Sequence, residues 1–183
     1  MQTAYCNSRA TNYLVHNGIN TQLVKTGVKH AHHVTKHFDI GANDEPNGHG
    51  TVAYDPEKLE HALSGNNSID AQKLRTLLSI SNRVVGDSIA NLLVIESILY
   101  DLDMSIVKFD KIYSENPSKL HKIKVDDRTK FKTIDDESRL THPSELQDLI
   151  DACVASVDDG KAFVRPSGTE DILRLYVEAK TDE

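Results

Sequence analysis

The feature that most restricts the fold of this chain is a predicted helix followed by two predicted strands near its C-terminal end. Ser144-Glu145-Leu146-Gln147 has the pattern of a helix-capping box. Apolar residues then recur at helical spacing and predict one apolar helix face, made by Leu146, Leu149, Ile150, Cys153, Val154 and Val157. Residues 162–165 and 172–179 are predicted strands on either side of a turn. This order predicts a small α+β domain.

Residues 19–54 give weaker signals. Residues 19–28 predict a short strand that ends in a turn, and residues 30–38 predict a short helix. Residues 40–47 contain two glycine or proline residues and several short polar ones, which disfavour a regular strand. The Asn-Gly-His-Gly sequence at 47–50 predicts a turn, and residues 51–54 predict a strand after it.

Three helices are predicted in the following fifty residues. The first begins at Asp55-Pro56, because aspartate accepts hydrogen bonds from the first helical amides and proline fits the first turn. Leucines at 74, 77 and 78 predict the second. The third, over 89–102, is apolar nearly all round, so we expect it to be buried in the core.

The pattern changes after Met104. A short helix is predicted over 106–113, a break at Asn116-Pro117-Ser118, and strands around 123–125 and 131–134. We therefore expect an α/β chain of two domains. Residues 1–104 form a mixed α/β domain and residues 105–183 a smaller α+β domain.

Composition narrows the possible functions. The chain has 183 residues, 38% hydrophobic and 27% charged, which is typical of a globular protein. Its formal net charge of −7 disfavours a nucleic-acid binder, and any anionic substrate must be held by local positive groups. No run of about 18 apolar residues predicts a membrane span. With no signal peptide and with Cys6 and Cys153 expected as reduced thiols, we expect a cytoplasmic protein.

The strongest local signal for chemistry is the sequence Arg165-Pro166-Ser167-Gly168-Thr169-Glu170 between two predicted strands. Arginine offers a planar fork for two phosphate oxygens, and Ser167 and Thr169 offer hydroxyls. Gly168 allows a sharp turn in which successive N–H groups form an anion-binding nest. Arg174, in the next strand, can return to the same site. The alternative is an ordinary Ser-Gly hairpin turn with a solvated arginine.

A second signal is Glu45-Pro46-Asn47-Gly48-His49-Gly50. A carboxylate and a carboxamide two residues apart on a tight loop suit the hydroxyl groups of a sugar. The alternative is a plain polar β-turn.

A third signal is a histidine cluster, His30, His32, His33 and His37. On a helix His33 and His37 are one turn apart and could share a metal ion. Only Asp39 is near enough in sequence to add a carboxylate. We therefore expect solvent-facing or hydrogen-bonded histidines and no metal site in this chain.

Five segments together resemble the phosphoacetylglucosamine mutases in order and spacing over nearly the whole chain. They are Thr26-Gly27-Val28-Lys29-His30, Phe38-Asp39-Ile40-Gly41, Asn47-Gly48-His49-Gly50-Thr51, Val85-Gly86-Asp87 with the helix through Glu96, and Ala162 to Asp171. That family belongs to the α-D-phosphohexomutases. The resemblance implies the interconversion of N-acetylglucosamine 6-phosphate and 1-phosphate, on the route to UDP-N-acetylglucosamine.

The resemblance also implies roles for particular residues. Family members have four domains: the first carries a phosphorylated serine, and the second holds Mg²⁺ in an aspartate-rich loop. The third carries a sugar-binding loop, which Glu45, Pro46, Asn47 and His49 match. The fourth carries a phosphate-binding loop, which 165–169 with Arg174 match. Lys29 and His30 are implied to approach the reacting centre.

This chain departs from the family in two respects. The phosphoserine loop and the aspartate-rich metal loop are absent, and Asp101-Leu102-Asp103 lies in a helical pattern. We therefore expect the third and fourth domains only, as a fragment, a truncated gene product or a diverged paralogue, with Mg²⁺ bound elsewhere and the missing domains as partner. Ala42-Asn43-Asp44 and Pro46 replace the family's usual residues and weaken the strand that leads into the sugar loop. Two other functions stay open: a non-catalytic module that binds sugar phosphates, and a mutase acting on glucose or mannose phosphates.

Overall fold

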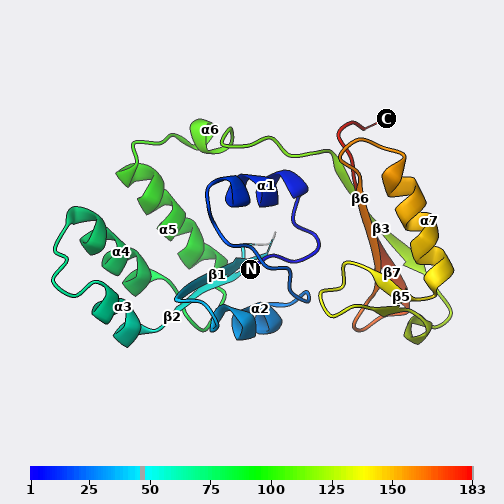
Figure 1. Cartoon of the computed structure of the whole chain (residues 1–183), viewed down its shortest axis with the longest axis horizontal. Coiled ribbons are helices and arrows are strands. Elements are labelled where there is room, and N and C mark those ends of the chain that lie inside the picture. Colours follow the sequence, from blue (N-terminus) through cyan, green and yellow to red (C-terminus); the bar gives the residue numbers. More distant parts are fainter. Residues whose placement is uncertain (46–47, 183) are drawn as a thin grey trace. The chain divides into compact units, whose positions relative to one another are not determined.

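The computed structural model describes residues 1–45 and 48–182, and its contacts divide the chain into two compact units. The first unit is Met1–Gln2 with Gly27–Ile112, and the second is Thr3–Thr26 with Tyr113–Glu183. Figure 1 gives the labels of the helices and strands in both units. Each unit is described by itself below.

A two-stranded antiparallel sheet and one helix form the base of the first unit. Strand β1 (Ile40–Asp44) pairs with β2 (Gly50–Tyr54), and helix α2 (Val28–Thr35) packs on both strands. The prediction that residues 40–47 disfavour a strand is wrong for 40–44. Gly41 is needed there, because a Cβ atom at this position would lie 2.6 Å from the Thr35 carbonyl oxygen. The Asn43 Nδ2 donates across the strands to Thr51 Oγ1 at 2.7 Å, whereas its buried Oδ1 has no hydrogen-bond partner among the described residues.

Four helices follow in the first unit: α3 (Pro56–Ala62), α4 (Ile69–Ile80), α5 (Ser88–Asp101) and the short α6 (Ile106–Phe109). The start predicted at Asp55 is confirmed, because its Oδ1 accepts hydrogen bonds from the Glu57 and Lys58 amides at 2.9 and 3.2 Å. Asp87 caps α5 in the same way.

The expected burial of the third predicted helix is wrong for this chain. Of the described residues of α5, Leu99 is buried, whereas Tyr100 is 91% exposed. Further apolar side chains that are exposed on or just after α5 are Ile89, Leu92, Leu93 and Leu102. An apolar pattern shows that a helix needs cover, but it does not show that the same chain supplies it.

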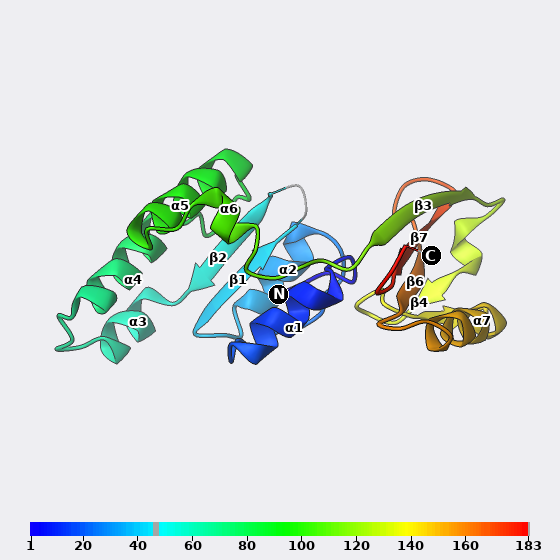
Figure 2. The same cartoon turned by 90° about the horizontal axis from the view of Figure 1, so that it is seen from above.

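The second unit is built on a three-stranded antiparallel sheet in the order β3-β7-β6, made by Ser118–Lys124, Ile172–Glu178 and Lys161–Pro166. A smaller sheet pairs β4 (Lys132–Thr133) with β5 (Leu140–His142). Helix α7 (Ser144–Ala155) lies along one side of the larger sheet (Figure 2). The strands predicted in this half are confirmed.

Each face of the larger sheet contributes to a separate hydrophobic cluster. On the α7 face, Val164 and Leu173 pack with Leu140 and Ile150. On the opposite face, Phe163 and Tyr176 pack with residues from the start of the chain, Ala4 and Tyr5. This alternation follows from the period of two along each strand, which sends successive side chains to opposite faces.

Helix α7 is confirmed, but its predicted capping box is wrong. Pro143 is the N-cap residue, and no side chain bonds the helix start. Gln147 is instead buried, and its Oε1 accepts a hydrogen bond from the Leu140 amide at 2.7 Å. Because the Gln147 side chain makes this hydrogen bond to Leu140, it is not used to cap the helix. Part of the predicted apolar face is also uncovered, since Leu149 is 65% exposed and Cys153 is exposed.

Residues 3–26 belong to the second unit for a clear physical reason. Helix α1 (Ser8–His16), which the sequence did not predict, begins beside Glu178 of β7. The buried Glu178 carboxylate accepts hydrogen bonds from the Ser8 amide at 3.0 Å, from Asn116 Nδ2 at 3.1 Å and from the Tyr176 hydroxyl at 2.9 Å. The strand predicted over 19–28 is wrong: only an isolated bridge at Leu23 is present there.

Among the described residues, no helix combines the length and the apolar character that crossing a membrane requires.

Candidate functional site

The loop between β6 and β7 has the geometry of a tight turn with converging polar groups. The Ser167 amide donates to the Ile172 carbonyl oxygen at 2.9 Å, which closes the turn. The Thr169 amide points at Ser167 Oγ, 3.4 Å away. Ser167 is only 5% exposed, so its hydroxyl is fixed at the base of the loop. One hydroxyl and one backbone N–H therefore meet on the same side of this turn.

Gly168 does not serve the purpose that the sequence suggested. Its backbone is not in the left-handed region, and a Cβ atom placed on it would meet nothing within 4 Å. The turn itself therefore does not require glycine. Because glycine has no side chain, the space next to the backbone is open, and a ligand can approach the backbone closely.

Arg165, at the end of β6, is held by two partners that the sequence did not reveal. Its Nε donates to the Tyr5 hydroxyl at 2.8 Å, and its Nη1 lies 3.5 Å from Glu137 Oε2. The two side chains of this ion pair are only 12% and 10% exposed. Glu137 is fixed in turn, because it also accepts a hydrogen bond from the Thr26 amide at 3.2 Å. Arg165 is thus an oriented cation with a defined position.

The sheet register places two further cations beside Arg165. Arg165 is directly opposite Arg174 on β7, and Arg174 is directly opposite Lys122 on β3. Residues opposite one another in an antiparallel sheet share a face, so these three side chains form one row. Like charges opposite one another repel, and an anion bound on this row would relieve that repulsion. The expectation that Arg174 contributes to the site of the Arg165 loop stays a prediction.

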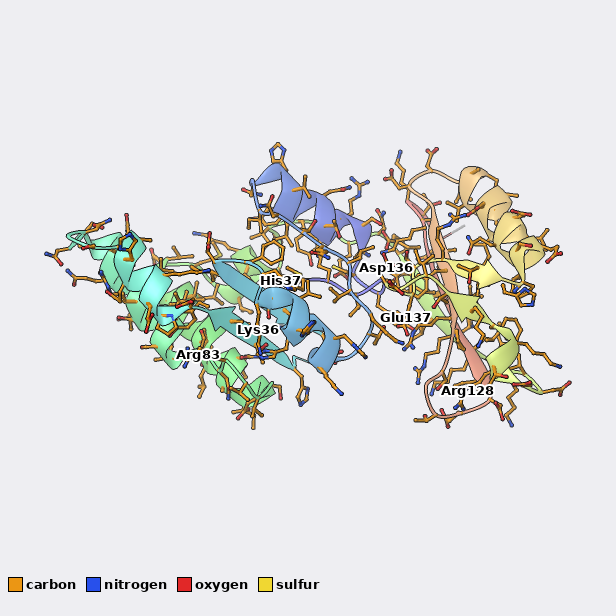
Figure 3. The ribbon with its side chains drawn as sticks, turned by 60° about the horizontal axis from the view of Figure 1, so that its bottom comes forward. Lys36, His37, Arg83, Arg128, Asp136 and Glu137 are labelled. Carbon is orange, nitrogen blue, oxygen red and sulfur yellow. The ribbon has the colours of Figure 1, made fainter. Side chains whose placement is uncertain are left out.

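A fourth cation contacts the loop from outside the sheet. Arg128, in the short 3-10 helix η1 (Arg128–Lys130), donates from Nη2 to the Gly168 carbonyl oxygen at 3.1 Å. Figure 3 labels it beside this turn. The sequence offered no signal for this contact, since Arg128 and Gly168 are 40 residues apart.

The second predicted loop, between β1 and β2, lies in the first unit. The Gly48 amide donates to the Glu45 carbonyl oxygen at 2.8 Å, and the Glu45 amide donates to the His49 carbonyl oxygen at 3.1 Å. These bonds form a tight turn that brings Glu45 and His49 to its base. Pro46 and Asn47 lie outside the described residues.

Helix α5 and the residues before it hold the β1–β2 loop in place. Asn91 Nδ2 donates to the carbonyl oxygens of Gly48 and Gly50 at 3.1 and 3.2 Å. Gly86 packs so closely that a Cβ atom there would lie 3.2 Å from the Gly50 amide nitrogen. Gly48 has a φ of 79°, a conformation that favours glycine. The sequence did not predict Asn91 as a support of this loop.

Lys29 and His30 lie at the start of α2, and both are exposed. His32 and His33 follow on the same helix, and the rings of His33 and His37 are 6.0 Å apart. The expectation that these histidines bind no metal stays a prediction.

Comparisons with known proteins give similarity over the entire chain. The family model of phosphoacetylglucosamine mutase AMG1, domain III, matches residues 1–104, and that of the phosphoglucomutase/phosphomannomutase C-terminal domain matches residues 120–183. Phosphoacetylglucosamine mutase 1 of Schizosaccharomyces pombe is 43% identical over 100% of this chain and 36% of that protein. The enzyme of Arabidopsis thaliana is 37% identical over 100% of this chain and 35% of that protein.

Solved structures agree with the sequence comparisons. An N-acetylglucosamine-phosphate mutase in its substrate complex has a TM-score of 0.91 and 41% identity, over 98% of this chain and 35% of that one. The Aspergillus fumigatus mutase in complex with GlcNAc-6P and magnesium has a TM-score of 0.91 and 35% identity, over 98% of this chain and 37% of that one. The expected α/β fold class is thereby confirmed. The chain spans little more than a third of the length of these relatives.

Proposed function

The chain belongs to the phosphoacetylglucosamine mutase family of the α-D-phosphohexomutases, and we propose that it supplies the sugar-binding and phosphate-binding loops of such an enzyme. The reaction is the interconversion of N-acetylglucosamine 6-phosphate and N-acetylglucosamine 1-phosphate. The relatives' names describe mutases, and one related structure contains GlcNAc-6P.

The observation that carries this proposal is the row of cations next to the β6–β7 turn. Arg165, Arg174 and Lys122 share one face of the sheet, and the Ser167 hydroxyl and Thr169 amide converge in the adjoining turn. A phosphate dianion requires several donors and local positive charge, and the net charge of −7 makes that local charge necessary. In our proposal Arg165 and Arg174 neutralise the phosphate, and residues 166–169 surround its oxygens.

The β1–β2 loop would bind the sugar. Glu45 would accept hydrogen bonds from paired sugar hydroxyls, while Asn47 and His49 would donate or accept, and Pro46 would stiffen the loop. Each loop would contribute mainly by positioning the group that it binds and, for the phosphate, by offsetting its charge. We propose that Lys29 and His30 lie toward the reacting centre of the whole enzyme.

A related mutase structure contains magnesium, and we propose that this chain does not supply the site for that ion. Among the described residues, no group of three or more His, Cys, Asp or Glu side chains is arranged to hold a metal. Asp101 Oδ2 is in an ion pair with Lys73 Nζ at 2.7 Å. Mg²⁺ favours oxygen ligands, several of them carboxylates or waters. We therefore propose that Mg²⁺ is held by other parts of the enzyme, and we assign it no step here.

We further propose that residues 1–104 and 105–183 are the third and fourth domains of the enzyme, with the other domains as partners. The ranges of the two matching family models support this division, although residues 3–26 pack with the later half. A cytoplasmic location is also our proposal, supported by two thiols that form no disulfide in the described structure.

The isolated chain is proposed to bind substrate without turning it over, because its sequence has no match to the family's phosphoserine loop. Ser167 has a holding role, since no base contacts its hydroxyl among the described residues. A coupled mutase assay with Mg²⁺ and a bisphosphate activator should give background rates. Turnover that disappears in Arg165→Ala would contradict this proposal.

Binding is tested by titrating N-acetylglucosamine 6-phosphate into the ¹⁵N-labelled chain and following amide shifts by NMR. We expect shifts at Ser167 to Glu170 and at Gly48 to Gly50. Glucose 6-phosphate should shift the first group with lower overall affinity, and N-acetylglucosamine alone should leave the first group unmoved. Absence of any saturable shift at 167–170 would remove the phosphate site.

A further inference from the structure

Arg128 is fastened to the phosphate-loop candidate at two points. Its Nη2 donates to the Gly168 carbonyl oxygen at 3.1 Å, and its backbone amide donates to Asp171 Oδ1 at 3.3 Å. The Val125 amide adds a bond to the Asp171 carbonyl oxygen at 3.1 Å. The segment 125–128 therefore braces the turn from outside the sheet (Figure 3).

The contact with Gly168 fixes the direction of a particular N–H group. In a trans peptide the C=O and the following N–H point in opposite directions. Because the Gly168 carbonyl points at Arg128, the Thr169 N–H must point away from Arg128. It does so, and lies 3.4 Å from Ser167 Oγ. At that distance the bond is weak, so the Thr169 N–H can exchange it for a bond to an incoming acceptor.

Without such a brace, the Gly168–Thr169 peptide would have more than one favourable orientation. Glycine has access to a wider range of backbone angles than any other residue, and a Cβ atom placed on Gly168 would meet nothing within 4 Å. A rotated peptide would present its carbonyl oxygen to the anion, which is repulsive. A single hydrogen bond to that carbonyl is enough to favour one orientation.

The placement of Arg128 is itself fixed by its neighbours. Asp127 Oδ1 accepts hydrogen bonds from the Thr129 amide at 2.8 Å and from the Thr129 hydroxyl at 2.6 Å. These bonds hold the turn that presents Arg128, so that its side chain starts from a defined backbone position.

We propose that Arg128 is a positioning residue for phosphate binding, which orients the Thr169 N–H toward the anion through its hydrogen bond to the Gly168 carbonyl. This inference rests on the proposed phosphate-binding role of residues 165–169. Arg128 differs from Arg165 and Arg174 in its mode of action, because it acts on the loop rather than through the row of cations on the sheet.

The test compares Arg128→Met with Lys130→Met in the whole chain. Both variants remove one positive charge from the same short helix, but only the first removes the bond to Gly168. The probe is N-acetylglucosamine 6-phosphate, with affinity and individual amide shifts read by NMR. We expect Arg128→Met to weaken binding about three- to tenfold, the effect of one lost hydrogen bond, and Lys130→Met to weaken it less than about twofold.

A second readout separates orientation from charge. In ligand-free Arg128→Met the Thr169 amide signal should move, and its shift on binding should shrink, whereas Lys130→Met should leave both unchanged. Arg128→Lys, which keeps a donor and the charge, should restore part of the affinity and the Thr169 shift. Arg128→Gln serves as a second variant if Arg128→Met loses its folded NMR spectrum.

Equal affinities and equal Thr169 shifts in Arg128→Met and Lys130→Met would overturn the inference. If those two variants behave alike while the wild type binds and Arg165→Ala does not, the proposed phosphate site stands and only the role of Arg128 is refuted. If the wild type shows no binding at 167–170, the proposed function fails first, and the inference with it.

Discussion

The two units of this chain differ in how well their own residues cover apolar side chains. In the second unit, strands β6 and β7 pack against α7 on one face and against residues 4–5 on the other, and each face has a cluster of buried hydrophobic residues, whereas β3 is exposed along its length. In the first unit, α5 leaves Ile89, Leu92, Leu93 and Tyr100 exposed, Leu93 at 57%, and Leu99 is its buried residue among those described. The same contrast holds for the two loops. The β6–β7 loop continues two strands of a covered sheet, whereas the β1–β2 loop depends on Asn91, more than forty positions later.

The difference shows how the residues of each candidate loop are held in position. The phosphate-loop candidate takes its cation row from strand register, which a covered sheet fixes strongly. The sugar-loop candidate takes its shape from hydrogen bonds and close packing by residues 86–91. A large-to-small substitution in a hydrophobic cluster of the second unit should therefore lower the free energy of unfolding much more than the same substitution on α5 of the first unit.

The largest effect is expected from a pair of matched leucine substitutions. Leu173 of β7 is 4% exposed and lies in a hydrophobic cluster, so Leu173→Ala should lower the free energy of unfolding by about 2–5 kcal/mol. Leu93→Ala, on an exposed position of α5, should change it by no more than about 0.5 kcal/mol. Urea unfolding followed by circular dichroism measures both. Similar losses in the two variants would mean that α5 is covered after all.

An intermediate effect is expected in the first unit from Asn91→Ala. The side chain donates two hydrogen bonds to the β1–β2 loop, so its loss should lower stability by about 1–2 kcal/mol and move the amide signals of Gly48 to Gly50. Asn67→Ala, at an exposed position outside any helix, is the control and should leave those signals in place. Unchanged loop signals in Asn91→Ala would show that close packing at Gly86 alone holds the loop.

The smallest effect is expected from the exposed ion pair between Arg139 and Asp151 in the second unit, 2.6 Å apart. The hydrogen bond from Arg139, with a lesser one from Gln147, lowers the pKa of Asp151. A lowered carboxyl pKa contributes stability above the pKa of the unfolded chain, and that contribution is lost as pH falls through the folded pKa.

Arg139→Gln should therefore be nearly neutral at pH 7, because both side chains are solvated. Below about pH 4, the usual carboxyl range, the variant should lose less stability than the wild type as the pH falls. Thermal unfolding at pH 7, 4 and 2.5 measures this. A loss at pH 7 comparable with that of Leu173→Ala would contradict the contrast between covered and exposed positions.

The sequence predicted most of the second unit because its signals are local. The strands on either side of residues 166–171 and helix α7 follow from spacing over short stretches. The first unit was harder, because Gly41 and Asn43 look like strand breakers and are tolerated only through contacts with Thr35 and Thr51. In the second unit, the sequence did not predict helix α1.

The candidate site was predictable only where its residues are contiguous. Residues 165–169 were proposed from their composition, and Arg174 from its place on the next strand. Tyr5, Glu137 and Arg128 were not found, because each comes to the loop from a separate part of the chain. The exposure of α5 could not be predicted from the sequence either, since an apolar pattern does not identify the surface that covers a helix.

We propose above all that the β6–β7 loop and Arg165 bind the phosphate of the substrate. The most direct measurement is the affinity of the wild type and of Arg165→Ala for N-acetylglucosamine 6-phosphate, with Arg139→Ala as the control that removes an exposed arginine of the same unit. Loss of a charge-assisted contact of about 1.5–3 kcal/mol predicts binding about ten- to a hundredfold weaker in Arg165→Ala and nearly unchanged in Arg139→Ala. Equal affinities in the wild type and in a folded Arg165→Ala variant would contradict the account.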